Sequence, residues 1–404
     1  MATFSLKKLG PGLLFAGAAI GVSHLVQSTR AGADFGMGLV WALLFIHLIK
    51  YPFFQFGPRY AAATGESLLA GYKRLGKGVL ICYFIMTLLT MFTIQTAVTI
   101  VTAGIATYLF GINIDIVAWS IIITLLCAGI LILGNYKILD KLMKVIIVTL
   151  TISTLIAVAI AFFDKTNPVS LEQVIPKDKL GIAFLIAFMG WMPAPLDISI
   201  WHSLWSLEKA KEGDMNVKAA LFDFNIGYLG TIIVGICFIS LGALVMFNTG
   251  TTFSSSGTAF AKQLIDMYTS HLGEWAFVII GIAAFTTMFS TTLTTLDASP
   301  RSMAKTTELL TGKTLKHSYT LWIIILIVGT CSILVFLTSE MGQLVQIATI
   351  LSFLTAPFFA IANYLVMTSS AVPEEARPKK PLRILSWISI ALLVAFSVWY
   401  LITL

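Results

Sequence analysis

The chain has 404 residues, of which 58% are hydrophobic and 11% are charged, and its formal net charge is +7. A mean hydropathy of +0.92 excludes an ordinary soluble domain and indicates a protein whose surface faces lipid. Because the excess of lysine and arginine falls in alternate loops between apolar runs, we do not interpret it as a nucleic-acid-binding surface.

Apolar runs of about 20 residues predict transmembrane helices. The runs lie near residues 9–33, 37–58, 78–109, 115–134, 138–163, 180–206, 218–248, 274–298, 318–338, 342–369 and 383–403. The first run continues into a glycine-containing break without a small-residue cleavage site, so we expect no removable signal peptide. The sequence therefore predicts an all-α, multi-pass integral membrane protein with eleven spans.

Lysine and arginine residues fall in every second loop. They are Lys7, Lys8, Arg59, Lys73, Arg74, Lys77, Lys137, Lys141, Lys144, Lys209, Lys211, Lys218, Arg301, Lys305, Lys313, Lys316, Arg377, Lys379, Lys380 and Arg383. The other loops carry only Lys165, Lys177, Lys179 and Lys262. By the positive-inside rule the N-terminus is cytoplasmic, and an odd number of spans places the C-terminus outside. The compact loops favour a bacterial inner membrane.

Two of the apolar runs are interrupted at the expected depth of the membrane centre. The interruptions are Gly21-Val22-Ser23-His24 and Trp191-Met192-Pro193-Ala194-Pro195. Unwound backbone persists in a membrane only where it lines a cavity or binds something. Paired breaks in two halves of a chain point to a binding site at the interface of two repeats. We therefore predict one transporter domain over residues 1–404, with repeats at about 9–163 and 180–369 and an extra helix at about 383–403.

The polar residues at the breaks admit two interpretations each. His24 lies inside a predicted unwound segment, and we favour a role in substrate binding, although a buried histidine is more often structural. Asp197 either caps the helix that follows the second break, which we favour, or turns into the cavity to bind a cation. We expect Arg30 to pair with Asp34 four residues later, and Lys50 to be a helix-end anchor.

Further residues in the apolar runs also admit a functional and a structural interpretation. The run at 286–295 is rich in threonine, and Ser290, Thr291 and Thr294 are candidates for a sodium site. The alternative interpretation is that these hydroxyl groups donate hydrogen bonds to carbonyls of their own helix. Gln95 is a candidate pathway residue among threonines, and His202 has a structural role at least as readily as a functional one. The single cysteines Cys82, Cys127, Cys237 and Cys331 are expected to be inert core residues.

Several segments together resemble one transporter family. They are residues 10–14 (Gly-Pro-Gly-Leu-Leu), 60–68 (Tyr-Ala-Ala-Ala-Thr-Gly-Glu-Ser-Leu), 135–144 (Asn-Tyr-Lys-Ile-Leu-Asp-Lys-Leu-Met-Lys), Met192-Pro193, His202-Ser203 and the run at 286–295. The chain is similar in these positions, and in the order and spacing of its helices, to the NRAMP family of divalent-metal transporters. The resemblance implies a LeuT-type fold with a 5+5 inverted repeat, an eleventh helix, and helices 1 and 6 broken at mid-membrane.

The metal-binding residues of that family are not retained. Where metal-transporting members carry Asp-Pro-Gly-Asn in broken helix one, this chain has Gly21-Val22-Ser23-His24. Where they carry Met-Pro-His in helix six, it has Met192-Pro193-Ala194, and Pro195 can equally be aligned with the family proline. Met192 alone is more often a packing residue than a ligand. The buried charges of the family's proton route in helices three, six and nine are missing as well.

Two substrate classes remain open. A divalent cation needs anionic or carbonyl oxygens, so the missing carboxylate narrowly favours a small anion such as bicarbonate, with sodium as a candidate coupling ion and no other cofactor. The predicted substrate site comprises Gly21, Val22, Ser23, His24, Trp191, Met192, Pro193 and Ala194. The alternatives are a divalent-cation transporter of the Mg or Mn type with a rebuilt site, and a sensor or scaffold that no longer transports.

No nucleophile, base and orienting group cluster, so we do not expect an enzyme. The expected partners are the small ion and the lipid bilayer, and the expected assembly is a monomer.

Overall fold

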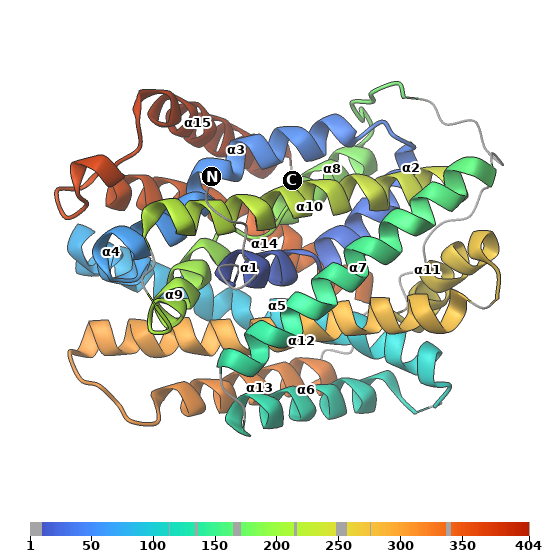
Figure 1. The fold of residues 1–404 in the computed structure, drawn as a ribbon, viewed down its shortest axis with the longest axis horizontal. Helices are drawn as coiled ribbons and strands as arrows, with labels where there is room; N and C mark the ends of the chain where they lie inside the picture. The colour runs from blue at the N-terminus through green and yellow to red at the C-terminus, as the bar shows by residue number, and fades with distance from the viewer. Residues whose placement is uncertain are drawn as a thin grey trace.

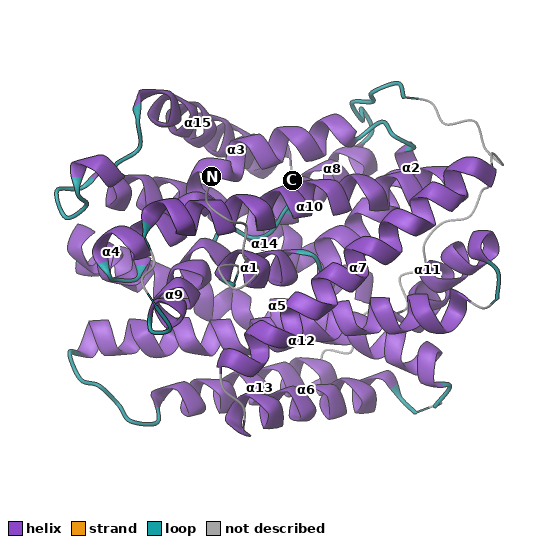
Figure 2. Ribbon diagram, in the orientation of Figure 1, coloured by secondary structure: helices purple, strands orange, loops and turns teal. Residues whose placement is uncertain are grey.

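The computed structural model of the protein describes residues 10–112, 114–133, 136–164, 171–213, 216–247, 257–274, 276–336 and 341–403. Over these residues the chain consists of helices joined by turns and loops, without a strand (Figure 2). In chain order the elements are α1 (Pro11–Ala19), η2 (Ser23–Ser28), α2 (Thr29–Phe35), α3 (Val40–Thr64), α4 (Leu68–Leu75), α5 (Lys77–Phe110), α6 (Ile116–Leu133), α7 (Tyr136–Asp164), α8 (Lys179–Trp191), α9 (Ile198–Ala210), α10 (Val217–Val245), α11 (Gly257–Leu272), α12 (Ala276–Thr311), α13 (Ser318–Phe336), α14 (Met341–Thr368), η3 (Glu374–Ala376) and α15 (Lys380–Thr403).

Each predicted apolar run corresponds to a helix or to a broken pair of helices. Within the described part of the chain, eight helices are long and apolar enough to cross a membrane, and the bent pair formed by α1 and η2–α2 adds a ninth. The two remaining predicted runs correspond to α8 with α9 and to α12. The sequence did not predict α4 and α11, because α4 carries Lys73 and Arg74, and α11 carries Lys262 and Asp266. Lys7, Lys8, Asn135 and Lys165 lie outside the described residues.

The outermost helices present apolar side chains outward. In Figure 1, α6 and α13 lie side by side along one edge of the molecule and α15 lies at the opposite edge. Large side chains such as Leu125 of α6, Val328 of α13 and Trp387 of α15 are more than half exposed. Water would disfavour such a surface, whereas hydrocarbon does not. These edges are therefore lipid-facing.

The short helix α1 lies in the middle of the bundle, where it contacts α7, α9, α10 and α12 (Figure 1). The segment η2, which follows the first break, contacts α8. The two broken helices therefore contact each other twice, α1 with α9 and η2 with α8. The core around them contains many buried hydroxyl and charged side chains in addition to apolar ones. The fold thus brings the two predicted breaks together at the centre of the molecule.

The start of α1 is held against α10 by a carboxylate. Asp223, which is buried in α10, accepts hydrogen bonds from the backbone N–H groups of Gly10 (3.0 Å) and Gly12 (2.6 Å). A negative side chain at a helix N-terminus pairs N–H groups that have no partner within the helix. A Cβ at Gly12 would collide with the backbone of Asp223. The Gly-Pro-Gly segment is therefore required for the close approach of the two helices.

We expect Gly12→Ala to lower the free energy of unfolding by about 1–3 kcal/mol, because the added methyl group forces α1 away from α10. The change would be measured as a lower Tm of the purified protein. Gly78→Ala is the matched control, since a Cβ there meets no atom within 4 Å. An equal Tm for both variants would show that the α1–α10 contact can relax.

Candidate functional site

The first break separates α1 from η2. The chain leaves the helix after Ala19, resumes at Ser23, and bends by 48° between the two halves. Gly21 lies directly against α12, where a Cβ would stand 2.7 Å from the Thr291 hydroxyl oxygen. The prediction of a break at this position is confirmed, although Ser23 and His24 belong to the first turn of η2 rather than to the unwound residues.

The second break separates α8 from α9. The helix ends at Trp191 and the next begins at Ile198, with Met192 buried in the turn between them. The first N–H groups of α9 are already paired, because Ile198 donates to the Pro195 carbonyl (3.2 Å) and Ser199 donates to that of Leu196 (3.1 Å). These two N–H groups at the start of the half-helix are therefore not free to bind an anion.

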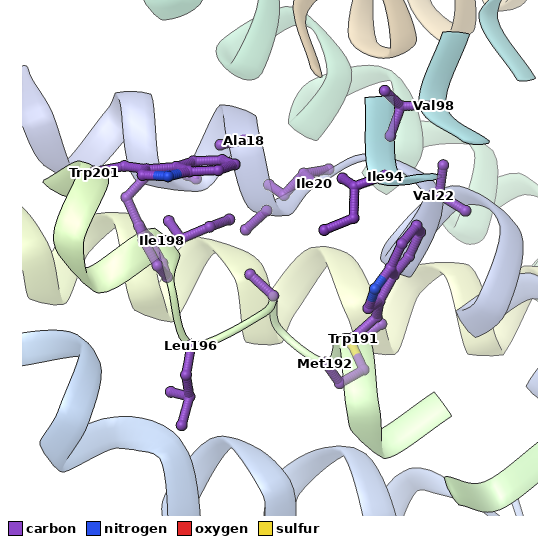
Figure 3. Packing of buried hydrophobic residues seen from close by; sticks show 14 of the residues in the cluster. Ala18, Ile20, Val22, Ile94, Val98, Trp191, Met192, Leu196, Ile198 and Trp201 are labelled. Carbon is purple, nitrogen blue, oxygen red and sulfur yellow. The ribbon is translucent and has the colours of Figure 1, made fainter. Parts of the chain in front are cut away.

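A small cavity lies between the two breaks. The residues that line it are Ala18, Ala19, Val22, Ser23, Ile94, Val98, Trp191, Ala194, Pro195, Ile198, Trp201, Thr291 and Thr295. Figure 3 shows the indoles of Trp191 and Trp201 flanking this space, with Ile94, Val22 and Val98 between the helices. Its volume of about 30 Å³ accommodates a water-sized solute. None of these lining side chains carries a charge, and only Ser23, Thr291 and Thr295 supply hydroxyl groups.

His24 is anchored to the protein backbone instead of lining this cavity. Its Nε2 lies 3.0 Å from the Thr231 carbonyl, and its Nδ1 lies 2.8 Å from the Ser23 hydroxyl and 3.0 Å from the Ala19 carbonyl. With the proton assigned to Nε2, the ring donates to Thr231 and accepts from Ser23. Both ring nitrogens are thus engaged within the protein, and the imidazole joins the first break to α10.

The polar residues of α5 and α12 hold these two helices together. The Gln95 carbonyl oxygen accepts from the Thr295 hydroxyl (2.7 Å), and its amide donates to the Thr292 carbonyl (3.2 Å). Gln95 bridges α5 and α12 and does not line the cavity between the breaks.

The candidate sodium ligands are divided between two environments. Ser290 and Thr294 donate to carbonyls of their own helix, as the alternative interpretation expected. Thr291 also reaches the broken helix, because its hydroxyl lies 3.2 Å from the Gly17 carbonyl of α1. Of the three candidates, Thr291 alone forms a hydrogen bond to α1 among the described residues.

Three expectations for charged residues are wrong. Asp197 makes no side-chain capping bond to α9; its Oδ1 is buried without a hydrogen-bond partner. Lys50 is not a helix-end anchor, because it is fully buried and donates to carbonyls at the second break. Arg30 stacks on the ring of Phe184 at 5.5 Å rather than forming an ion pair with Asp34.

A larger cavity of about 440 Å³ lies between α2, the start of α8, and α14. Its lining includes Arg30, Asp34 and Asp178, together with Gln27, whose buried Oε1 has no hydrogen-bond partner. Gln27 follows Ser23 by one turn, so this cavity approaches the first break from one end of the bundle. We call it the vestibule.

In the second half of α9, away from the break, a charged cluster joins α9 to α12 and α13. Asp297 of α12 accepts from Arg301 (2.6 and 3.1 Å), from the Tyr319 hydroxyl of α13 (2.7 Å) and from the Trp205 indole of α9 (3.4 Å). His202, one turn before Trp205, stacks on Phe15 with both ring nitrogens unpaired, which fits a packing role. The sequence prediction missed the Asp297 cluster; the i, i+4 spacing of Asp297 and Arg301 was the available signal.

The residues that the structure describes contain no group of three or more histidine, cysteine, aspartate or glutamate side chains placed to hold a metal ion. Met192 does not line the cavity, and the sequence offers no carboxylate in the first break. The lining is therefore unlike a site of hard anionic ligands for a divalent cation.

A bundle of apolar helices with two of them broken around a central cavity defines a membrane transporter. Residues 12–403 match the family described as natural resistance-associated macrophage protein-like (Nramp), and the chain belongs to that family. An uncharacterized protein of Pasteurella multocida is 35% identical over 401 residues, which cover 97% of this chain and 91% of the relative. The divalent metal cation transporter MntH of Staphylococcus saprophyticus is 24% identical over 412 residues, covering 98% and 91%.

Solved structures of transporters share the fold. A manganese transporter of Eremococcus coleocola superimposes with a TM-score of 0.74 at 14% identity, over 96% of this chain and 84% of that chain. MhsT in complex with L-phenylalanine gives a TM-score of 0.63 at 17% identity, covering 98% and 99%. The predicted LeuT-type fold is therefore confirmed, and the family and its structural neighbours are transporters rather than enzymes.

We expect His24→Ala to lower the free energy of unfolding by about 2 kcal/mol, because it removes the buried imidazole that bonds to the Thr231 carbonyl through Nε2 and to the Ser23 hydroxyl through Nδ1. Tm and transport by the variant would be measured together. A lost flux with an unchanged Tm would contradict this structural role and would support direct substrate binding.

Proposed function

We propose that the protein is a secondary-active transporter that moves a small inorganic anion such as bicarbonate by alternating access. The substrate passes through the cavity between the two breaks, bounded by Trp191 and Trp201. The observation that supports an anion is the lining itself, which offers hydroxyl groups and apolar surface but no carboxylate.

The charges around the cavity are the second argument against a divalent cation. A partly dehydrated divalent cation needs anionic oxygen ligands in a medium of low dielectric constant. Asp197 is the carboxylate of the second break, and it does not line the cavity. The polar groups of the lining are the Ser23, Thr291 and Thr295 hydroxyls, which would have to turn from their present acceptors to donate to an oxyanion.

A divalent-cation transporter is the second candidate. Family membership favours it, as do the relative named as a divalent metal cation transporter and the structural neighbours named as manganese transporters. In that case the unpaired Oδ1 of Asp197 would have to turn toward the ion. A sensor or scaffold is a lesser third candidate, and it would show no flux of either kind.

Coupling to sodium is part of the same proposal. The Thr291 hydroxyl lies between α12 and the Gly17 carbonyl of α1, which supports a cation site between these helices. Within the proposal the chain sits in a bacterial inner membrane as a monomer. Its N-terminus is cytoplasmic, as the alternation of basic loops predicts.

Purified protein in liposomes tests the substrate. We expect sodium-dependent internal alkalinisation when bicarbonate is supplied, and no entry of manganese or magnesium reported by ion-sensitive dyes. Empty liposomes are the control for leakage. Entry of manganese or magnesium without bicarbonate flux would overturn the anion proposal and favour the second candidate, and no flux of any ion would favour the third.

Thr291→Val tests the coupling ion. The substitution keeps the shape of the side chain and removes the hydroxyl group, so we expect the sodium concentration for half-maximal flux to rise about tenfold. Thr286→Val is the matched control, because the Thr286 hydroxyl bonds only to carbonyls of its own helix. Equal sodium dependence in both variants would place the coupling ion elsewhere.

A further inference from the structure

The ammonium group of Lys50 is enclosed by backbone carbonyls at the second break. Its Nζ donates to the carbonyls of Gly190 (2.6 Å), Met189 (3.0 Å) and Ala194 (3.2 Å). The side chain reaches this position from α3 and is 0% exposed. An ammonium group has three donors, so these three oxygens satisfy it completely.

The same oxygens have the character of a cation site. Two of them belong to the last turn of α8, where carbonyls lack partners within the helix and the helix dipole is negative. The third comes from the unwound segment, and its oxygen converges on the same point. Carbonyls at the end of a half-helix and in unwound backbone are the ligands that broken-helix transporters use for cations.

A buried carboxylate belongs to the same break. Asp197 is the residue that directly precedes α9. Its Oδ1 is buried and has no hydrogen-bond partner. Three carbonyl oxygens with a nearby carboxylate match the oxygen-only ligand preference of hard cations such as Na⁺ and Mg²⁺.

We propose that the second break contains a hard-cation site formed by the carbonyls of Met189, Gly190 and Ala194, with Asp197 as the carboxylate of the same break, and that the Lys50 ammonium permanently occupies it. The protein thus carries its own cation at this break and needs no dissolved ion there. Removal of the Lys50 charge would leave the carbonyls unsatisfied inside the bundle and would open the site to a dissolved cation. This inference concerns the second break only and does not depend on which ion is transported.

Lys50→Met tests the site, because methionine fills a similar volume without a charge or a donor. We expect the variant to have a lower Tm than the wild type, and NaCl or MgCl₂ at about 100 times its Kd to raise that Tm by about 3 °C. Choline chloride at the same ionic strength should leave the Tm unchanged. The wild type can respond to NaCl only through the sodium site proposed at Thr291, so each salt should raise the Tm of Lys50→Met more than that of the wild type.

Two further variants separate the site from general loss of stability. Lys50→Arg keeps a positive charge at the break, so it should respond to Na⁺ and Mg²⁺ no more than the wild type does. Lys50→Met combined with Asp197→Asn should lose the response to Mg²⁺, because the carboxylate is gone. If Lys50→Met does not fold, Lys50→Gln carries the same expectation. An equal response in the wild type, or no response in either neutral variant, would overturn the proposal.

Discussion

Every backbone carbonyl and amide within a membrane must find its partner inside the protein, and the two broken helices are where this constraint is most severe. The structure meets it with side chains from other helices. Lys50 of α3 binds the carbonyl end of α8, and Thr291 of α12 reaches the Gly17 carbonyl of α1. The Ala19 carbonyl accepts from the Gly21 N–H (2.9 Å), and the His24 imidazole donates to the Thr231 carbonyl of α10. The breaks therefore persist because the surrounding helices supply donors at fixed positions.

The pattern of these contacts has a chemical consequence for what the cavity can bind. Carbonyl oxygens at both breaks are already paired with protein donors, and the lining of the cavity contains no carboxylate. The oxygens available to a metal ion are thus reduced on both sides of the site. The chain shares its fold with a solved manganese transporter, but a shared fold does not determine what the site binds, because function resides in the site rather than in the architecture.

The two ends of the bundle are held differently. At one end the vestibule of about 440 Å³ approaches the first break, and the buried Gln27 faces it with an unpaired oxygen. At the far end of α9, Asp297 binds Arg301, Tyr319 and Trp205 and so joins α12, α13 and α9. Breaking a buried pair of this kind is costly, because it leaves an uncompensated charge. The Asp297 end of the bundle is thus held by charged hydrogen bonds, whereas the other end contains the vestibule.

The sequence by itself determined the class, the apolar helices and the positions of both breaks, because these depend on local hydrophobicity and on residues such as Gly21 and Pro193 that interrupt a helix. Its family motifs also identified the fold. It could not determine which groups Lys50, Asp197 and Arg30 contact. The sequence pattern around a charged residue in an apolar helix is the same whether that residue is a helix-end anchor, a cap or a ligand. The tertiary structure decided this: the partners of Lys50 lie about 140 residues away in the chain, at α8 and the break that follows it. Similarly, Gln95 and His24 find their partners on α12 and α10, because only the packing of distant helices brings those carbonyls and hydroxyls within hydrogen-bonding distance.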